Sequence, residues 1–459
     1  MLKFCEQHLR LIQYTPIMRQ QLLIDGAHLI HYEIRGIVKK ATQLQDLGKS
    51  IYWENIGDPI VKNSKIPRWI KDIVAVQVQD DKSYGYCHSK GELETREFLS
   101  QKNNSLDGVQ ITAEDVLFFN GLGDAIGKIY QFLDPFARVI GPSPAYSTHS
   151  SLESAHSNKD PLTYTLDPEN NWYPDLEDLY LKVKYNPNIV GILIINPDNP
   201  TGMVYPVSYL KKIVEIAREF DLFIISDEVY GNIIYNDTET LKLAEVIQDV
   251  PGIALKGISK ELPWPGSRCG WMEFYNRGND PEFDAFCNTL ENAKMVEVCS
   301  TTLPQKTIPE IMSHPDYIDY IYDKNQRIKQ RGEVIAGYFA DNPFINFNKT
   351  NGAFYNTIVF KEGVLKAGQS LAINDTEAKN LFDQWTADET PLDKHFVYSL
   401  LAATGICVVP LSSFGSDLMG FRITLLEEDE EILNHIFRNI SEAITAYCNS
   451  VNKTVLSNK

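Results

Sequence analysis

One short segment of the sequence sets two basic side chains among residues that restrict the backbone. The segment reads SKELPWPGSRCGW from Ser259, and it holds Lys260 and Arg268 eight positions apart. A lysine amine attacks carbonyl carbons well once burial or a neighbouring cation lowers its pKa. An arginine guanidinium is a planar fork that suits phosphate oxygens. The pair predicts a reactive lysine beside a phosphate site, against the alternative of two surface charges. Lys256 is a rival amine, although it falls inside an expected strand.

A second group of polar residues, SDEVY, follows the apolar run DLFII. Asp227 ends a strand that we expect to be buried, where an unpaired carboxylate is costly. A protonated ring nitrogen of a ligand would satisfy it. Tyr230, three residues on, suits a second contact with the same ligand. Glu228 could equally be the functional acid.

Four more segments carry polar or conformationally restricted residues at the ends of apolar runs. NGLGDAI opens a helix with glycines whose backbone N–H groups could hold an anion. Tyr146, in GPSPAY, could lay its ring over a planar ligand. In NPDNPTG, Asn196 and Asn199 each precede a proline, which favours a sharply turned loop with an amide facing a ligand. Arg422, in GFRIT, either forms a surface ion pair or binds a carboxylate.

Alternating apolar runs and helical stretches lie around these residues. Between residues 110 and 260 the expected strands are VLFF, ARVIG, IVGILIIN, DLFIIS and IALKGIS, with helix-like stretches such as VSYLKKIVEIAREF between them. Continuous β-branched runs separated by helices indicate buried parallel strands in an α/β domain. Ligands of such sheets bind beyond the carboxyl ends of the strands. The segments described above stand at those ends.

The regions on either side have a different pattern. About the first 28 residues form an arm or an extra helix, and an amphipathic helix is expected from His28. After about residue 330, GAFYNTIVF, GICVVP and GFRITLL alternate with longer helices, which indicates a smaller α+β domain. The polar stretch 361–394 is expected to carry an insertion.

Composition limits the classes of partner. The chain has 459 residues and a net charge of −18, which argues against nucleic acid and anionic membrane surfaces as partners. No apolar run approaches the ~20 residues of a spanning helix. Seven cysteines without a paired spacing, and no CxxC or HExxH motif, predict free thiols, no metal and a cytoplasmic location.

Together the segments supply a phosphate cradle, a stacking ring, an acid for a ring nitrogen, donors for a ring oxygen and a Schiff-base lysine. One cofactor, pyridoxal 5′-phosphate (PLP), needs all of these. The ordered set NGLGDAI, PSPAY, NPDNPTG, SDEVY and SKELPWPGSRCGW resembles the class I/II aminotransferases of PLP fold type I, from about residue 28 to the end.

The resemblance implies a fold and a division of the chain. The fold is α/β, with a large domain whose mostly parallel sheet is sandwiched by helices, and a smaller α+β domain. The implied parts are an N-terminal arm (1–28), the N-terminal part of the small domain (29–66), the large PLP-binding domain (67–327) and the small C-terminal domain (328–459).

The resemblance also implies roles for the residues of the motifs. Lys260 forms the Schiff base with PLP and moves protons as acid and base, and Asp227 pairs with the pyridinium nitrogen. Tyr230 and Asn199 hold the phenolate oxygen, and Tyr146 stacks on the ring. Arg422 binds the substrate α-carboxylate. The groups implied to hold the phosphate are the backbone N–H groups of Gly121, Leu122 and Gly123 and the side chain of Arg268.

Two further segments extend the resemblance. IGDP is similar to an early glycine motif and implies that Gly57 lies close to the substrate. YGYCHSKG resembles the segment whose tyrosine, here Tyr86, reaches the phosphate of the partner subunit, which implies a homodimer with shared active sites. One departure concerns the phosphate. Many members have a serine three residues before the lysine, where this chain has Gly257, so Ser259 is the candidate replacement.

The implied activity is amino-group transfer from an L-amino acid to a 2-oxo acid in a ping-pong cycle. Other PLP enzymes share the same cofactor residues, so a C–S lyase, a β-decarboxylase or an aminocyclopropane-carboxylate synthase is the alternative. A non-catalytic binding module on this fold is a third possibility. The amino donor and acceptor stay open.

Overall fold

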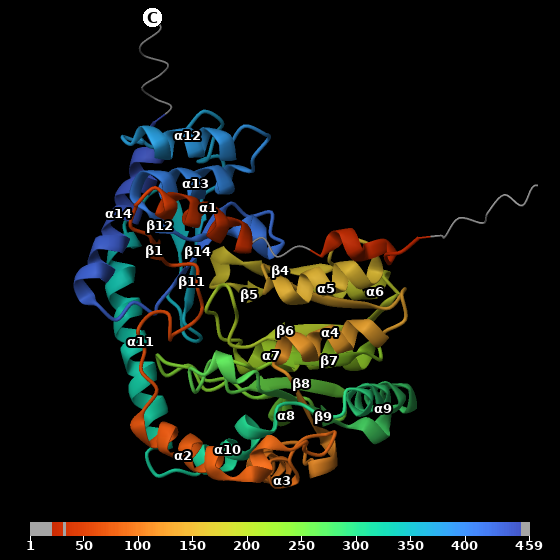
Figure 1. Cartoon of the computed structure of the whole chain (residues 1–459). Helices are drawn as coiled ribbons and strands as arrows, with labels where there is room; N and C mark the ends of the chain where they lie inside the picture. The colour runs from red at the N-terminus through yellow and green to blue at the C-terminus, as the bar shows by residue number, and fades with distance from the viewer. Residues whose placement is uncertain (1–20, 31–33, 451–459) are drawn as a thin grey trace, which may run out of the picture.

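The computed structural model describes residues 21–30 and 34–450. Its elements are arranged around a large sheet and a smaller one, with one long helix running beside both (Figure 1).

The large sheet is mostly parallel, as predicted. Its strand order is β2-β9-β8-β7-β6-β3-β4-β5. Strands β4, β3, β6, β7 and β8 run parallel, whereas β9 is antiparallel to both β8 and β2, and β5 is antiparallel to β4. The bounds are β2 Val116–Phe119, β3 Arg138–Ser143, β4 Thr163–Asp167, β5 Tyr173–Pro174, β6 Ile189–Ile195, β7 Phe223–Asp227, β8 Gly252–Gly257 and β9 Gly270–Tyr275.

Both faces of this sheet are buried. Along β6, Ile192 and Ile194 pack into one hydrophobic core, while Leu193 and Ile195 pack into another. Because successive side chains of a strand point to opposite faces, a strand covered on both sides needs apolar residues at every position. This requirement explains the continuous runs in the sequence.

Helices cover the two faces. One core contains residues of α4 (Leu122–Phe132), α5 (Ser147–Ser157) and α9 (Pro281–Val296). The other core contains residues of several more helices, listed here: α2 (Arg68–Gln79), α3 (Leu93–Asn104), α6 (Leu176–Tyr185), α7 (Val207–Glu219), α8 (Leu243–Val246) and α10 (Thr302–Met312).

The smaller sheet is antiparallel, and the core around it contains residues from both ends of the chain. Its order is β10-β11-β14-β13, and beside it β1 pairs in parallel with β12. Residues of α1, near the N-terminus, are buried in the same core as the C-terminal helices. The bounds are α1 Ile34–Asp46, β1 Tyr52–Trp53, β10 Ile345–Phe347, β11 Tyr355–Phe360, α12 Thr376–Trp385, α13 Leu392–Thr404, β12 Ile406–Cys407, β13 Val409–Pro410, β14 Gly420–Thr424 and α14 Glu430–Cys448.

Helix α11 (Tyr317–Phe339) connects the two regions without a break. Tyr317 at its start packs in a core of the large sheet, whereas Ile328 and Phe339 pack in the core of the small one. In Figure 1 it runs along one side, from near α2 and α10 to α14. The predicted boundary between residues 327 and 328 falls inside this helix, so the division into domains stays a prediction.

The structure differs from expectation near the N-terminus. The helix expected from His28 is described over Ile34–Asp46, and His28 itself belongs to a short 3-10 helix, Asp25–Leu29. That turn packs against α5 so closely that a Cβ at Gly26 would lie 2.0 Å from the carbonyl oxygen of Ala155. Residues 1–20 of the predicted arm lie outside the described residues.

The stretch 361–394 contains α12, and side-chain contacts tie this helix to the N-terminal part of the chain. Trp385 Nε1 donates a hydrogen bond to Gln43 Oε1 at 2.8 Å, and Lys49 forms an ion pair with Asp375. Over the described residues, no helix is both long and apolar enough to cross a membrane. The cytoplasmic location stays a prediction.

Candidate active site

The carboxyl ends of the parallel strands open into a cavity of about 540 Å³ between the two sheets. Strands β6, β7 and β8 end side by side here, as expected for ligand sites of open parallel sheets. The small unit, which consists of the small sheet and the elements packed in its core, contributes residues from β14 and from the loop after β1. Of the predicted residues, those that line the cavity are Gly57, Leu122, Gly123, Tyr146, Asn199, Asp227, Tyr230, Ser259, Lys260, Arg268 and Arg422.

Lys260 follows β8 by three residues and points its amine at the loop after β1. Its Nζ donates a hydrogen bond to the carbonyl oxygen of Gly57 at 2.7 Å and lies 5.9 Å from the centre of the Phe354 ring. The carbonyl oxygen of Lys260 in turn accepts from Lys324 Nζ at 3.3 Å. The lysine is therefore held at both its backbone and its amine.

Arg268 lies against the start of α4. Its guanidinium reaches the carbonyl oxygens of Pro265, at 3.2 Å, and Asn120, at 3.5 Å. Gly121 has a φ of +85°, and a Cβ there would lie 2.5 Å from the guanidinium. The first N–H groups of a helix have no partner within it. Leu122 and Gly123 therefore add two donors beside the cation, which makes an anion cradle.

Asp227 is 3% exposed and lies at the end of β7. Its Oδ2 is 3.0 Å from His149 Nε2, and its Oδ1 accepts from the backbone N–H of Val229 at 3.2 Å. His149 lies in the first turn of α5 and was missed by sequence reasoning. Its one signal is its position three residues after Tyr146.

Two tyrosines and an arginine form the side of the cavity nearest the small sheet. Tyr230 donates to the Tyr355 hydroxyl at 3.2 Å. Burial, and then the Tyr355 hydroxyl, raises the pKa of Tyr230 well above its ordinary value. Arg422 donates to Asn199 Oδ1 at 3.0 Å and to the carbonyl oxygen of Asn55 at 2.6 Å. Its guanidinium lies 4.3 Å from the centre of the Tyr355 ring. Sequence reasoning missed Tyr355.

Gly57 has no room for a side chain, since a Cβ there would lie 1.7 Å from the Tyr355 hydroxyl oxygen. Gly257 is restricted to a smaller degree, because a Cβ would lie 3.1 Å from the carbonyl oxygen of Cys269, the residue before β9, and 3.3 Å from Cα of Gly270. The close pairing of β8 with β9 is thus a physical reason for glycine at this position. Ser259 reaches the cavity instead.

Arg35 and Tyr86 differ in their position relative to the cavity. Arg35, on α1, lines the cavity and was not predicted. Tyr86 is 85% exposed and is not among the lining residues, so its predicted role at the partner's phosphate stays a prediction.

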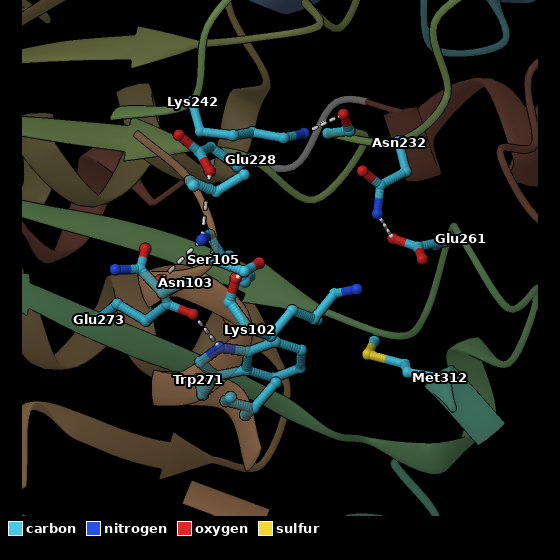
Figure 2. A pocket seen from close by; sticks show the side chains of 15 residues that line it. Lys102, Asn103, Ser105, Glu228, Asn232, Lys242, Glu261, Trp271, Glu273 and Met312 are labelled. Atoms are coloured by element: carbon cyan, nitrogen blue, oxygen red, sulfur yellow. Dashed lines mark hydrogen bonds and ion pairs between the residues drawn. The ribbon is translucent and has the colours of Figure 1, made fainter. Parts of the chain in front are cut away.

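The alternatives Glu228 and Lys256 belong to a second cavity, of about 190 Å³, on the other side of the sheet. Glu228 and Glu273 both line this cavity (Figure 2), and Glu273 Oε1 accepts a hydrogen bond from Trp271 Nε1 at 3.0 Å. Lys256 Nζ lies 2.7 Å from Glu273 Oε2 and 3.6 Å from Glu228 Oε2. Consecutive residues face opposite sides here, so Asp227 and Glu228 line different cavities.

The sequence matches the family model of class I and II aminotransferases over residues 55–437. It is 52% identical over 430 residues to an uncharacterized aminotransferase of Methanocaldococcus jannaschii, covering 94% of this chain and 99% of that protein. It is 30% identical over 395 residues to the glutamate–pyruvate aminotransferase AlaA of Escherichia coli K12, covering 85% of this chain and 96% of that protein.

Solved structures have the same architecture. An alanine aminotransferase from Pyrococcus furiosus superimposes with a TM-score of 0.80 at 26% identity, covering 93% of this chain and all of that one. A Thermus thermophilus aspartate aminotransferase double mutant superimposes with a TM-score of 0.76 at 18% identity, over 93% of this chain and all of that one. The second likeness concerns the fold alone.

Proposed function

This chain belongs to the class I and II aminotransferase family, and we propose that it transfers the amino group of L-glutamate to pyruvate with PLP as cofactor. The protein is an aminotransferase, as predicted, and its fold is PLP fold type I. An aminotransferase is therefore favoured over the alternatives of a lyase, a decarboxylase or a non-catalytic module. The choice of substrates follows the name of the Escherichia coli relative.

The observation that carries the proposal is the convergence of four charged side chains on one cavity. Lys260, Asp227 and Arg268 come from the large sheet, and Arg422 comes from the small one. The glycine-lined cradle beside Arg268 suits a phosphate, because a Cβ at Gly121 would fill it. The buried carboxylate of Asp227 suits a cationic ring nitrogen. The residues present therefore fit PLP.

When bound, PLP supplies an electron sink for the electron pair released from the substrate Cα–H bond. The chain's own groups do the rest. Lys260 would take the proton from Cα as a general base and would then deliver it, as a general acid, to C4′ of the cofactor. Arg422 binds the α-carboxylate through its planar fork, and this fixes Cα near the lysine. His149 and the Val229 N–H orient the Asp227 carboxylate.

A dicarboxylic substrate needs a second cation. Arg35 lines the same cavity, and it makes no hydrogen bond or ion pair with the residues that the structure describes. Its guanidinium is therefore available for the side-chain carboxylate of glutamate. Alanine and pyruvate have no such group and would leave Arg35 in water.

The activity test uses purified protein reconstituted with PLP. L-Glutamate and pyruvate together should give 2-oxoglutarate and alanine, each assayed separately, and either substrate alone should give at most one turnover per site. Release of ammonia without a second oxo acid, or no exchange of amino groups with any donor in a panel that includes aspartate, would contradict the proposal.

The specificity test is Arg35→Gln. Loss of a charge-assisted hydrogen bond should raise KM for glutamate by roughly 10- to 100-fold, since such bonds contribute about 1.5–3 kcal/mol. KM for alanine should change less than about twofold. Lys39→Gln is the matched control, because Lys39 is an exposed cation on the same helix and does not line the cavity. Equal changes for glutamate and alanine would exclude Arg35 as the second cation.

A further inference from the structure

A third cavity, of about 310 Å³, adjoins the active site and shares Lys260 with it. Its wall is formed by α11, by the loop that follows Gly57 and by the chain after β14. Pro263, Phe354 and Leu426 give it an apolar part. The PLP-binding groups described above, at Arg268, Asp227 and Tyr146, do not line it.

The charged residues of this cavity are nearly all basic. Its lining contains one carboxylate, Glu428, and five cationic side chains, namely Lys65, Lys260, Lys324, Arg327 and Arg331. This composition is opposite to that of the whole chain, whose net charge is −18. Like charges gathered in one recess repel one another, and the carboxylates of Glu261, Glu427 and Glu428 offset them only in part, which favours binding of an anion.

The single carboxylate is already shared. Glu428 Oε1 lies 3.8 Å from the Arg331 guanidinium and also accepts a hydrogen bond from Ser64 Oγ at 3.0 Å. Arg331 Nε is buried without a hydrogen-bond partner among the described residues. Lys65 and Arg327 form no hydrogen bond or ion pair within the described part of the chain. Three of the cations therefore have hydrogen-bonding capacity left for a ligand.

Lys324 is the innermost cation. It donates hydrogen bonds to the carbonyl oxygens of Lys260 and Glu261, and burial lowers its pKa to about 8. Glu261 raises this pKa in part, whereas the neighbouring Arg327 lowers it further. A bound anion would relieve that repulsion within a few ångströms of the backbone of the reactive lysine.

We propose that this cavity is an anion site that binds a small dianion, either a phosphate or a dicarboxylate, separately from the α-carboxylate site at Arg422. Guanidinium groups bind both ligands through paired N–H donors, and Lys65 adds a point charge at the rim. The apolar part of the wall limits the ligand to a short carbon chain or none.

The test is calorimetric titration of inorganic phosphate into the PLP-loaded enzyme in a phosphate-free buffer. The visible absorption of bound PLP is recorded first, so that failure to bind the cofactor is seen separately from failure of the anion site. In this form the cradle at Arg268 is already filled by the cofactor phosphate. Saturable binding of one phosphate per chain is expected, and Arg327→Gln and Lys65→Gln should each weaken it about tenfold.

The matched control is Lys329→Gln. This substitution removes one positive charge from the same helix, two positions after Arg327. Residues two positions apart do not share a helix face. Phosphate affinity should be unchanged in this variant. An equal loss in all three variants would indicate general electrostatics and overturn the proposal.

A second titration with succinate distinguishes the two ligand sources. Succinate that displaces phosphate, with the same dependence on Arg327, supports a dicarboxylate ligand. Phosphate binding that succinate does not displace supports a phosphate ligand. Saturable succinate binding that depends on Arg327, without phosphate binding, also supports the site. Absence of any Arg327-dependent binding of either anion would overturn it.

Discussion

Asp198 is a carboxylic acid buried completely in the NPDNPTG loop, directly before Asn199 of the active-site wall. Its Oδ2 accepts hydrogen bonds from the backbone N–H and the hydroxyl of Thr201, whereas its Oδ1 has no hydrogen-bond partner among the described residues. Burial raises the pKa of Asp198 to about 7. The folded protein therefore holds a proton here that the unfolded chain releases near pH 4.

This difference predicts a pH dependence of stability. The folded state binds more protons than the unfolded state between about pH 4 and pH 7, so this group's contribution to stability falls as the pH rises through that window. Asp198→Asn keeps the shape and cannot ionise. The free energy of unfolding of this variant should rise relative to that of the wild type by up to about 1.4 kcal/mol per pH unit from pH 5 to 7. Urea unfolding at several pH values measures the gap, and a constant gap would contradict the assignment.

Motif spacing predicted the active-site residues that lie at strand ends. Asp227 and Lys260 were predicted in this way because each directly follows an apolar run. His149 and Tyr355 were not, because their partners Asp227 and Tyr230 lie 78 and 125 positions away in the sequence. Arg35 belongs to an amphipathic helix whose placement over the cavity depends on the small unit's packing. No local pattern carries that information.

Among the elements, α11 holds the loop that follows β7. Asn325 Nδ2 donates to the carbonyl oxygens of Asn232 at 2.8 Å and Ile234 at 3.1 Å. The Asn325 side chain is buried, and the residues whose carbonyls it binds, Asn232 and Ile234, are half-buried. Tyr230 lies in the same loop. The helix therefore supports the part of the active site that approaches the small sheet.

Asn325→Asp tests that support. The change removes both donors and directs a carboxylate at two carbonyl oxygens. The free energy of unfolding should fall by about 2–4 kcal/mol, since each unsatisfied buried group costs about 1–3 kcal/mol. Asn439→Asp on α14 is the control, because Asn439 Nδ2 bonds a carbonyl oxygen of its own helix at the surface. Denaturant unfolding compares the two, and similar small losses would show that α11 does not hold the loop.

The elements themselves were predicted unevenly. Strands β2, β3, β6, β7 and β8 were predicted because burial on both faces leaves unbroken apolar runs. Strand β9 was not, because it begins with a glycine inside the SKELPWPGSRCGW motif and owes its direction to pairing with β2 and β8. The start of α1 was placed too early, since apolar spacing alone does not show where a helix begins.

Across the whole molecule, exposed apolar side chains indicate which surfaces are suited to contact with a second subunit. Val76 and Tyr84 are 63% and 72% exposed, and Val296, at the end of α9, is 86% exposed. Tyr86, predicted to enter a partner's site, is in the same segment as Tyr84. These residues support the prediction of a homodimer with shared sites.

Mixed dimers test the sharing directly. Lys260→Ala and Tyr86→Ala variants should each be nearly inactive alone. If Tyr86 serves the partner's site, a mixed dimer carries both lesions in one site and none in the other. Exchange of subunits at equal amounts should then restore about a quarter of wild-type sites. Activity on mixing is the measurement, and Tyr84→Ala in place of Tyr86→Ala is the control. No recovery despite exchange would show that the sites are not shared.

The unbroken course of α11 has a mechanical consequence. With 23 residues, it is a rod of roughly 35 Å anchored at both ends in different cores. A relative rotation of the two units must twist or bend this rod, because there is no flexible joint to absorb it. Lys324, in the first half of this helix, donates a hydrogen bond to the backbone carbonyl of Lys260. Capture of a carboxylate at Arg422 in one unit would thus be transmitted as torque to the reactive amine in the other.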